Sequence, residues 1–296
     1  MHEHTDPYRA ERAARIALTE AMGDHRLSVA PGGRATDVLE IAPTLIREGA
    51  PGAEELRRAM DYKGERALAE GEETGARYII PTDPEWPATL RAAGLLAPLG
   101  LWIKGTPSLA EATEHAIALV GPGRGTDYGR HCAAYLARSL AVFGHNTIAA
   151  SIGVGGIGDR ALAVCAANRD RTPIGVTAGG FPIGDTEASR RHGNLLEKGG
   201  LLVSMYRPGS LPDKPRRLDR ERLIGCLGQA VTVIEGKGRK WETAALIAEL
   251  TGRPLLAVPG PIISDLSSLP NILIRDGRAR AVHSASGVIA RTYTRH

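Results

Sequence analysis

Three glycine-rich stretches follow short apolar runs in the second half of the chain, at residues 121–126, 153–158 and 179–180. Glycine has no Cβ, so its backbone N–H approaches an anion closely, and a helix that begins after the loop adds partial positive charge. The stretches therefore predict loops that cradle phosphate. The candidate residues are Gly121, Gly123, Ser151, Gly153, Gly155, Gly156, Gly179 and Gly180.

The second stretch matches the dinucleotide pattern G-x-G-x-x-G at Gly153, Gly155 and Gly158. A dinucleotide site also needs an acidic residue about 20 positions later, where it holds the ribose hydroxyls. The next apolar run ends in Thr177-Ala178-Gly179-Gly180, without a carboxylate. The pattern favours another phosphate or nucleic-acid ligand over NAD or FAD. Glycines required only by tight turns and close packing are the alternative.

A proline-punctuated segment, residues 207–222, contains six basic and three acidic side chains. A planar guanidinium donates two hydrogen bonds to one phosphate, so the segment indicates contact with an anionic ligand. The alternative is an ion-pair network with Asp219 and Glu221. The candidate DNA-binding residues, here and in two neighbouring loops, are Arg124, Lys214, Arg216, Arg217, Arg220, Arg222, Lys237, Arg239 and Lys240.

The sequence contains no combination of residues typical of catalysis. It has no G-x-S-x-G, no G-x-x-x-x-G-K-[ST] and no H-E-x-x-H pattern. Cys132, Cys165 and Cys226 are widely spaced, which argues against a disulfide or zinc framework. Glu235, at the end of an apolar run, is the one carboxylate placed for acid–base work. We therefore expect no enzyme activity, no cofactor and no metal.

Six apolar runs alternate with helical patterns after residue 113. They are residues 116–120, 147–150, 173–178, 201–205, 231–235 and 255–258. Strands buried on both faces that alternate with helices predict an α/β, Rossmann-like fold with a doubly wound, mainly parallel sheet. The loops that follow such strands lie along one edge, where ligands bind.

The 296 residues suit two domains. We expect a small helical domain over residues 1–76, with its third helix over 53–74. Residues 77–112 then form a connecting segment with short strands. Residues 113–296 form the Rossmann-like DNA-binding domain. Residues 1–112 carry 13 basic and 18 acidic side chains, a balance of −5, and residues 113–296 carry 24 and 15, a balance of +9. The basic part indicates an anionic ligand, or else a solvated surface.

No apolar run is long enough for a membrane span, and the N-terminus lacks a secretory signal, so we expect a cytoplasmic protein without a membrane partner.

The order of motifs resembles the DNA-processing protein A family (DprA, also called Smf). Residues 199–209, GGLLVSMYRPG, are similar to the family's G-G-L-L-x-S-E-Y-P-P-G, and residues 220–224, RERLI, stand where the family has R-N-R-x-I. Residues 252–261 resemble G-R-P-V-x-A-V-P-G-P, and 271–277 resemble N-x-L-I-R-D-G. The resemblance covers roughly residues 77–288. We see no room for the winged-helix C-terminal domain that some members carry.

The resemblance implies a non-enzymatic recombination mediator. Such a protein binds and protects single-stranded DNA, dimerises, and assists loading of a RecA-type recombinase in DNA uptake, natural transformation and recombination. The chain departs from the family in its loops: G-S-R becomes Gly121-Pro122-Gly123, with Arg124 one place later, and an aspartate is displaced to Asp159. Two alternatives stay open: an enzyme or sensor for a nucleotide or sugar phosphate, and a partner-binding protein that has lost its ligand site.

Overall fold

The computed structural model describes residues 6–22, 33–153, 155–238 and 242–293. Its described strands form one sheet in the order β1-β2-β6-β5-β4-β3-β7-β8-β9. The strands are β1 (Arg77–Ile79), β2 (Leu101–Lys104), β3 (Ala116–Val120), β4 (Thr147–Ser151), β5 (Ile174–Val176), β6 (Leu201–Ser204), β7 (Ala230–Val233), β8 (Leu255–Ala257) and β9 (Arg280–Ala281). From β6 to β9 all neighbours are parallel, whereas β2 is antiparallel to both of its neighbours. The predicted α/β, mainly parallel fold is confirmed.

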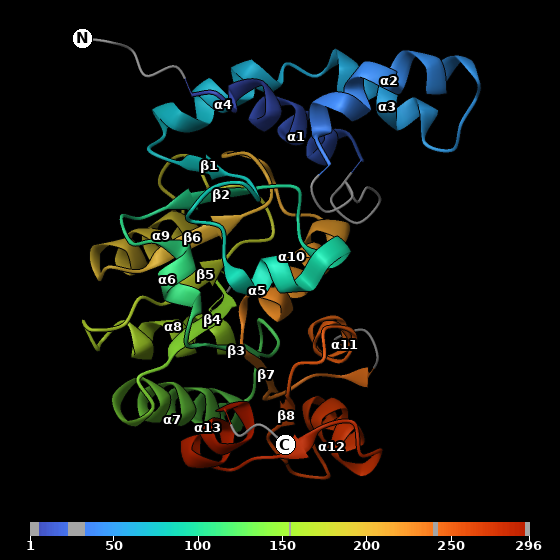
Figure 1. Cartoon of the computed structure of the whole chain (residues 1–296). Helices are drawn as coiled ribbons and strands as arrows, with labels where there is room; N and C mark the ends of the chain where they lie inside the picture. The colour runs from blue at the N-terminus through green and yellow to red at the C-terminus, as the bar shows by residue number, and fades with distance from the viewer. Residues whose placement is uncertain (1–5, 23–32, 154, 239–241, 294–296) are drawn as a thin grey trace.

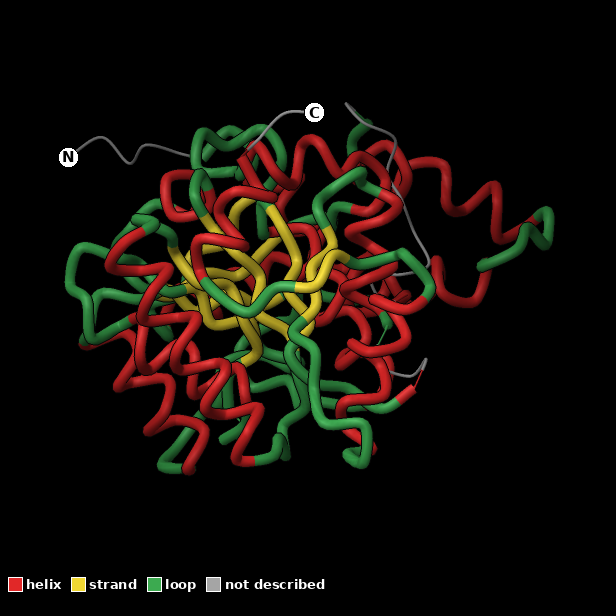
Figure 2. The backbone as a smooth tube through the Cα atoms, turned by 90° about the horizontal axis from the view of Figure 1, so that it is seen from below, coloured by secondary structure: helices red, strands yellow, loops and turns green. Residues whose placement is uncertain are grey.

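Helices cover both faces of the sheet, because each strand sends alternate apolar side chains to opposite sides. In β3, Ala118 and Val120 enter one core, and Ile117 and Leu119 enter the other. The first core is covered by α5 (Ala88–Ala93), α6 (Leu109–Thr113), α10 (Lys214–Leu227), α11 (Thr243–Leu250) and α12 (Ser268–Arg275). The second is covered by α7 (Asp127–Phe143), α8 (Ile157–Cys165), α9 (Glu187–Glu197) and α13 (Ala285–Tyr293). Figure 2 shows the strands enclosed between helices.

The N-terminal helices lie beyond the β1 end of the sheet (Figure 1). They are α1 (Arg9–Met22), α2 (Ala35–Arg47), α3 (Ala53–Asp61) and α4 (Gly64–Glu73). The single helix predicted over 53–74 is wrong, because the chain is extended at Tyr62 and α4 begins anew at Gly64. A Cβ on Gly64 would lie 2.2 Å from the carbonyl oxygen of Ala13, so close packing against α1 fixes the break.

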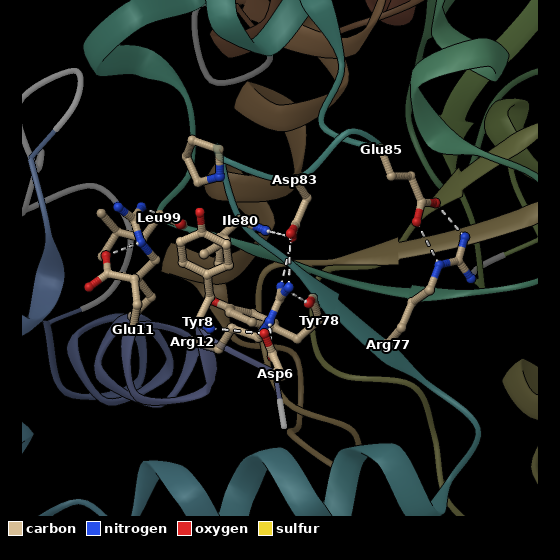
Figure 3. A network of polar contacts seen from close by, with 12 residues as sticks. Asp6, Tyr8, Glu11, Arg12, Arg77, Tyr78, Ile80, Asp83, Glu85 and Leu99 are labelled. Carbon is tan, nitrogen blue, oxygen red and sulfur yellow. Dashed lines mark hydrogen bonds and ion pairs between the residues drawn. The ribbon is translucent and has the colours of Figure 1, made fainter. Parts of the chain in front are cut away.

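Two arginines of α1 attach these helices to the segment that carries β1 and β2 (Figure 3). Arg12 donates to both carboxylate oxygens of Asp83, at 2.7 and 2.8 Å, and to the carbonyl of Tyr78 at 2.6 Å. Arg15, which is buried, donates to the carbonyl of Leu99 at 2.7 Å. The segment predicted to connect the domains is thus hydrogen-bonded into the main sheet through β1 and β2. The division of the chain at residues 76 and 112 stays a prediction. Among the described helices, none combines the length and hydropathy needed to cross a membrane.

Candidate nucleic-acid interface

The loop after β3, residues 121–126, lies where the winding of the sheet reverses. β4 pairs with one side of β3 and β7 with the other, and the helices that follow β3 and β7 cover opposite faces. Such a divergence opens a ligand crevice in α/β sheets. Here Glu235, only 1% exposed, accepts the backbone N–H of Thr126 at 3.0 Å and the Thr126 hydroxyl. Glu235 therefore accepts hydrogen bonds from the residue that precedes α7, and its carboxylate is used in a contact within the protein.

Two backbone amides of the second loop also donate to an acceptor within the chain. The backbone N–H groups of Gly153 and Gly155 donate to the two carboxylate oxygens of Asp159, each at 2.9 Å. Both glycines have positive φ, at 110° and 74°, which turns their amides toward the helix start. Gly158 permits close packing, because a Cβ there would lie 2.2 Å from the carbonyl oxygen of Ser151. A phosphate group at this loop would have to displace Asp159.

His192, on α9, lies beside this loop. It is 6% exposed, and a Cβ on Gly153 would lie 3.7 Å from its Nε2. Burial, with a smaller contribution from the charge of Lys104, lowers the pKa of His192 to about 4, although the charge of Asp159 opposes the shift. Its Nδ1 is buried without a hydrogen-bond partner within the described part of the chain. The imidazole is therefore neutral at pH 7 and forms part of the packing under the loop.

The third loop, Gly179-Gly180, packs directly on the backbone of the basic segment. A Cβ on Gly180 would lie 1.7 Å from the carbonyl oxygen of Arg207. The N–H of Gly180 donates to Ser210 at 2.9 Å, and the N–H of Gly209 donates back to Phe181 at 2.8 Å. These glycines bring two loops together, and phosphate binding by any of the three loops stays a prediction.

The basic segment divides into paired and exposed side chains. Asp213 caps α10 by accepting the N–H of Arg216 at 2.8 Å, so the helix begins at Lys214, within the basic segment. Arg220, 9% exposed, pairs with Glu221 at 2.7 Å, and Arg222 pairs with Asp219 at 3.7 Å. Two arginines of the predicted DNA-binding set thus take part in an internal ion-pair network.

Arg216 is the third paired arginine. Its guanidinium lies 4.3 Å from the ring centre of Tyr206 and 3.4 Å from the carboxylate of Glu20, on α1. Tyr206 is buried, and its hydroxyl donates to Asp219. The ring is therefore occupied by packing and does not offer a face for stacking a base.

Arg124, Lys214 and Arg217 are exposed, and none forms an ion pair with another residue that the structure describes. Lys237 is exposed and pairs with Asp265. Arg239 and Lys240 lie outside the described residues. The loops carrying these side chains follow β3, β6 and β7, and β6 lies four strand spacings from β7, about 19 Å. The exposed basic groups therefore extend along one edge of the sheet.

Two carboxylates of this region have roles that sequence reasoning missed. The signal for Asp159 is its place in the first turn of a helix after glycines, where an acidic residue favours capping. Glu20 had no local signal at all, because its partners lie 187 and 196 residues away. Across the described residues, no cluster of His, Cys, Asp or Glu side chains has the composition of a metal site.

The model of the family described as DNA recombination-mediator protein A matches residues 77–292. The chain belongs to this family. The match begins at β1 and covers the whole sheet, so it includes the glycine-rich loops and the basic segment.

Curated relatives carry the same family name. The DNA processing protein DprA of Mycobacterium tuberculosis is 35% identical over 229 residues, which are 73% of this chain and 57% of the relative. The Bacillus subtilis DNA processing protein DprA is 28% identical over 75% of this chain and 73% of its own length. Protein Smf of Escherichia coli is 30% identical over 68% of this chain and 53% of its own length. The matched part thus spans little more than half of two of these relatives.

Two solved structures share the fold. The DNA processing protein A of Streptococcus pneumoniae superposes with a TM-score of 0.71 at 23% identity, covering 98% of this chain and 97% of that protein. The Helicobacter pylori protein, whose structure was described for its single-stranded DNA binding mode, gives a TM-score of 0.57 at 22% identity, over 72% of this chain and 94% of its own. The first superposition includes the N-terminal helices as well as the sheet.

Proposed function

We propose that this protein binds single-stranded DNA at the edge of the sheet where β3, β6 and β7 end. The observation that carries the proposal is the exposed set Arg124, Lys214 and Arg217, which has no acidic partner among the residues described. Phosphate groups are the natural counter-ions for unpaired arginine and lysine side chains on one edge. The family supports a nucleic-acid ligand, and the H. pylori relative is described as binding single-stranded DNA.

As a recombination mediator of this family, the protein would protect the bound strand and pass it to a RecA-type recombinase. We include in the proposal that it acts as a homodimer in the cytoplasm and that it turns over no substrate. The internal role of Glu235, the one carboxylate placed for acid–base work, supports an activity based on binding.

A nucleotide or sugar phosphate is the weaker candidate. Its phosphate would need the amides of Gly153 and Gly155, and both amides already donate to Asp159. Where β3 and β7 diverge, the carboxylate of Glu235 already accepts the backbone N–H of Thr126. The exposed charge of Arg124, Lys214 and Arg217 extends along the loops, where an extended polyanion reaches it.

The test is fluorescence anisotropy of a labelled oligonucleotide, single-stranded and then duplex, at low and at physiological salt. We expect tight single-strand binding that weakens steeply with salt, because neutralised phosphates release counter-ions. Replacing Arg124, Lys214 and Arg217 together with Glu should abolish binding while the thermal unfolding midpoint stays unchanged, since all three side chains are exposed.

The matched control reverses three exposed basic residues away from this edge: Arg138, Arg169 and Lys198. It changes the net charge by the same amount and should leave most of the binding intact. Equal losses in both triple variants would mean that overall charge, and no particular edge, attracts DNA. A thermal shift with a mononucleotide but none with an oligonucleotide would favour the weaker candidate, and no shift with either would indicate a lost ligand site.

A further inference from the structure

Glu20, near the end of α1, contacts the basic segment from the acidic N-terminal part of the chain. Its carboxylate accepts the backbone N–H of Arg207 at 3.0 Å and pairs with the guanidinium of Arg216 at 3.4 Å. The side chains are 9% and 20% exposed, so the pair is largely shielded from water. Shielding strengthens an ion pair relative to one at the surface. Glu20 therefore neutralises one of the basic groups closest to the proposed DNA contacts.

The position of Arg216 does not depend on Glu20 alone. Its guanidinium is stacked on the buried ring of Tyr206, which holds it from the other side. Lys214 and Arg217, exposed and three residues apart, lie on one face of the helix directly beside it. A strand bound to Lys214 and Arg217 brings its phosphates next to a guanidinium that is already oriented.

A cavity of about 220 Å³ lies between α4 and the chain at Ile183, Arg207 and Pro208, so it borders the residue whose N–H Glu20 accepts. The same helices are held firmly elsewhere, because Arg12 binds Asp83 through two hydrogen bonds (Figure 3). Breaking the pair of Glu20 with Arg216 thus leaves the N-terminal helices attached through Arg12.

We propose that Glu20 competes with DNA phosphate for Arg216, as an internal latch that limits affinity for the strand. The proposal rests on the proposed function, since the competing ligand is the bound single strand. In the free protein the carboxylate holds Arg216. In the complex a phosphate takes its place and the end of α1 is released from the basic segment.

The variant that tests the latch is Glu20→Gln, measured by anisotropy with a labelled single strand over a range of salt. The amide keeps the shape and an acceptor for the N–H of Arg207, but it removes the charge opposite Arg216. We expect binding to tighten severalfold. The slope of log K against log salt should stay close to that of the wild type, because a phosphate is neutralised by Arg216 in both complexes.

The matched control is Glu65→Gln, an exposed carboxylate of the same helical part that pairs with Arg9. It removes the same charge and should change neither affinity nor slope. In a background of Arg216→Gln, Glu20→Gln should have no effect, because the two changes act through one contact. Hydrogen exchange at the end of α1 should rise when the wild-type protein binds the strand.

Unchanged or weaker binding by Glu20→Gln would overturn the latch, and so would an equal gain from Glu65→Gln. The proposed function fails separately: it is overturned if the wild-type protein does not bind a single strand, or if the Arg124, Lys214 and Arg217 triple variant binds as well. Wild-type binding that the triple variant loses and Glu20→Gln leaves unchanged would retain the DNA site and remove only the latch.

Discussion

The glycine-rich loops and the start of α10 lie at the same edge of the sheet, yet they use their polar groups differently. In the loops, the amides of Gly153, Gly155 and Thr126 donate to carboxylates of the chain itself. At the start of α10, Lys214 and Arg217 are exposed and form no ion pair with any residue in the described ranges. Both regions have the composition of an anion site, but the backbone amides named in the loops are already used, and the donors free for a ligand are the exposed side chains of Lys214 and Arg217, together with Arg124 on the first loop.

The difference shows that the composition of a loop does not determine the partner of its donors. A carboxylate that is already fixed in the fold needs no further ordering, so it satisfies a helix start at little entropic cost. The loop amides should therefore govern stability, and the exposed basic side chains should govern binding. The four predictions below test that division.

The largest effect is expected for Gly180→Ala. The new Cβ would lie 1.7 Å from the carbonyl oxygen of Arg207, and backbone on both sides must move to admit it. We expect a loss of about 3 kcal/mol or more in the free energy of unfolding, measured by urea denaturation. Gly193→Ala, in the interior of α9 with no atom within 4 Å of the new Cβ, should instead stabilise by about 0.5–1 kcal/mol. Similar results for the two variants would contradict the close packing of these loops.

Stability should also depend on the protonation of His192. Its pKa is lowered to about 4 in the folded protein, mainly by burial, below the ordinary value of about 6.5. The unfolded chain therefore binds a proton first as pH falls. The contribution of the neutral imidazole to the free energy of unfolding is complete above about pH 6.5. It is lost as the pH falls from about 6.5 to about 4, and the loss is about 3 kcal/mol at most. Urea denaturation across this range should show a flatter profile for His192→Gln, whereas the exposed His115→Gln should follow the wild type.

A smaller loss is expected for Asp159→Ala, because the amides of Gly153 and Gly155 lose a charged acceptor. We expect about 2 kcal/mol in the free energy of unfolding. Inorganic phosphate should restore part of it by binding the freed amides, and it should not stabilise the wild type through this loop. The control is Asp185→Ala, an exposed carboxylate that precedes α9 and should change stability by less than about 0.5 kcal/mol. A wild-type protein stabilised equally by phosphate would show that the loop is open to ligands.

The smallest effect belongs to the other region. Arg217→Ala should leave stability within about 0.5 kcal/mol of the wild type, since the side chain is exposed. It should weaken single-strand binding and lower the salt slope by about 0.7, as expected for one lost phosphate contact. Arg169→Ala, which removes the same charge beyond the end of α8, should alter neither quantity. A loss of stability without a change in binding would contradict this prediction. It would indicate that Arg217, like Arg216 and Arg220, makes an internal contact.

Much of the fold was predictable from local pattern. The apolar run over 116–120 indicated a strand buried on both faces, and β3 occupies those residues. The single helix over 53–74 was not predictable as two, because the break depends on the contact of Gly64 with Ala13 on another helix. The start of α10 has a local cause, the cap by Asp213, which a search for caps in the sequence can find.

The position of the basic segment in the fold was predictable, and the pairing of its arginines was less so. The sequence places Arg216, Arg217 and Arg220 on one short segment, and nothing in their spacing separates them. The structure pairs Arg216 with Glu20 and Arg220 with Glu221, and it leaves Arg217 exposed. Exposure decides which of them is free, and it depends on elements distant in the chain.

By itself, the sequence determined the alternation of buried strands and helices, because apolar periodicity fixes which faces must leave water. It also determined that basic residues and glycine loops gather at one edge, because all the strands concerned run in the same direction. Only the tertiary structure decided which of those groups are still free for a ligand. Glu235 reaches Thr126 across 109 residues, and Glu20 reaches Arg216 across 196. Such pairings follow from packing in three dimensions, and no local pattern records them.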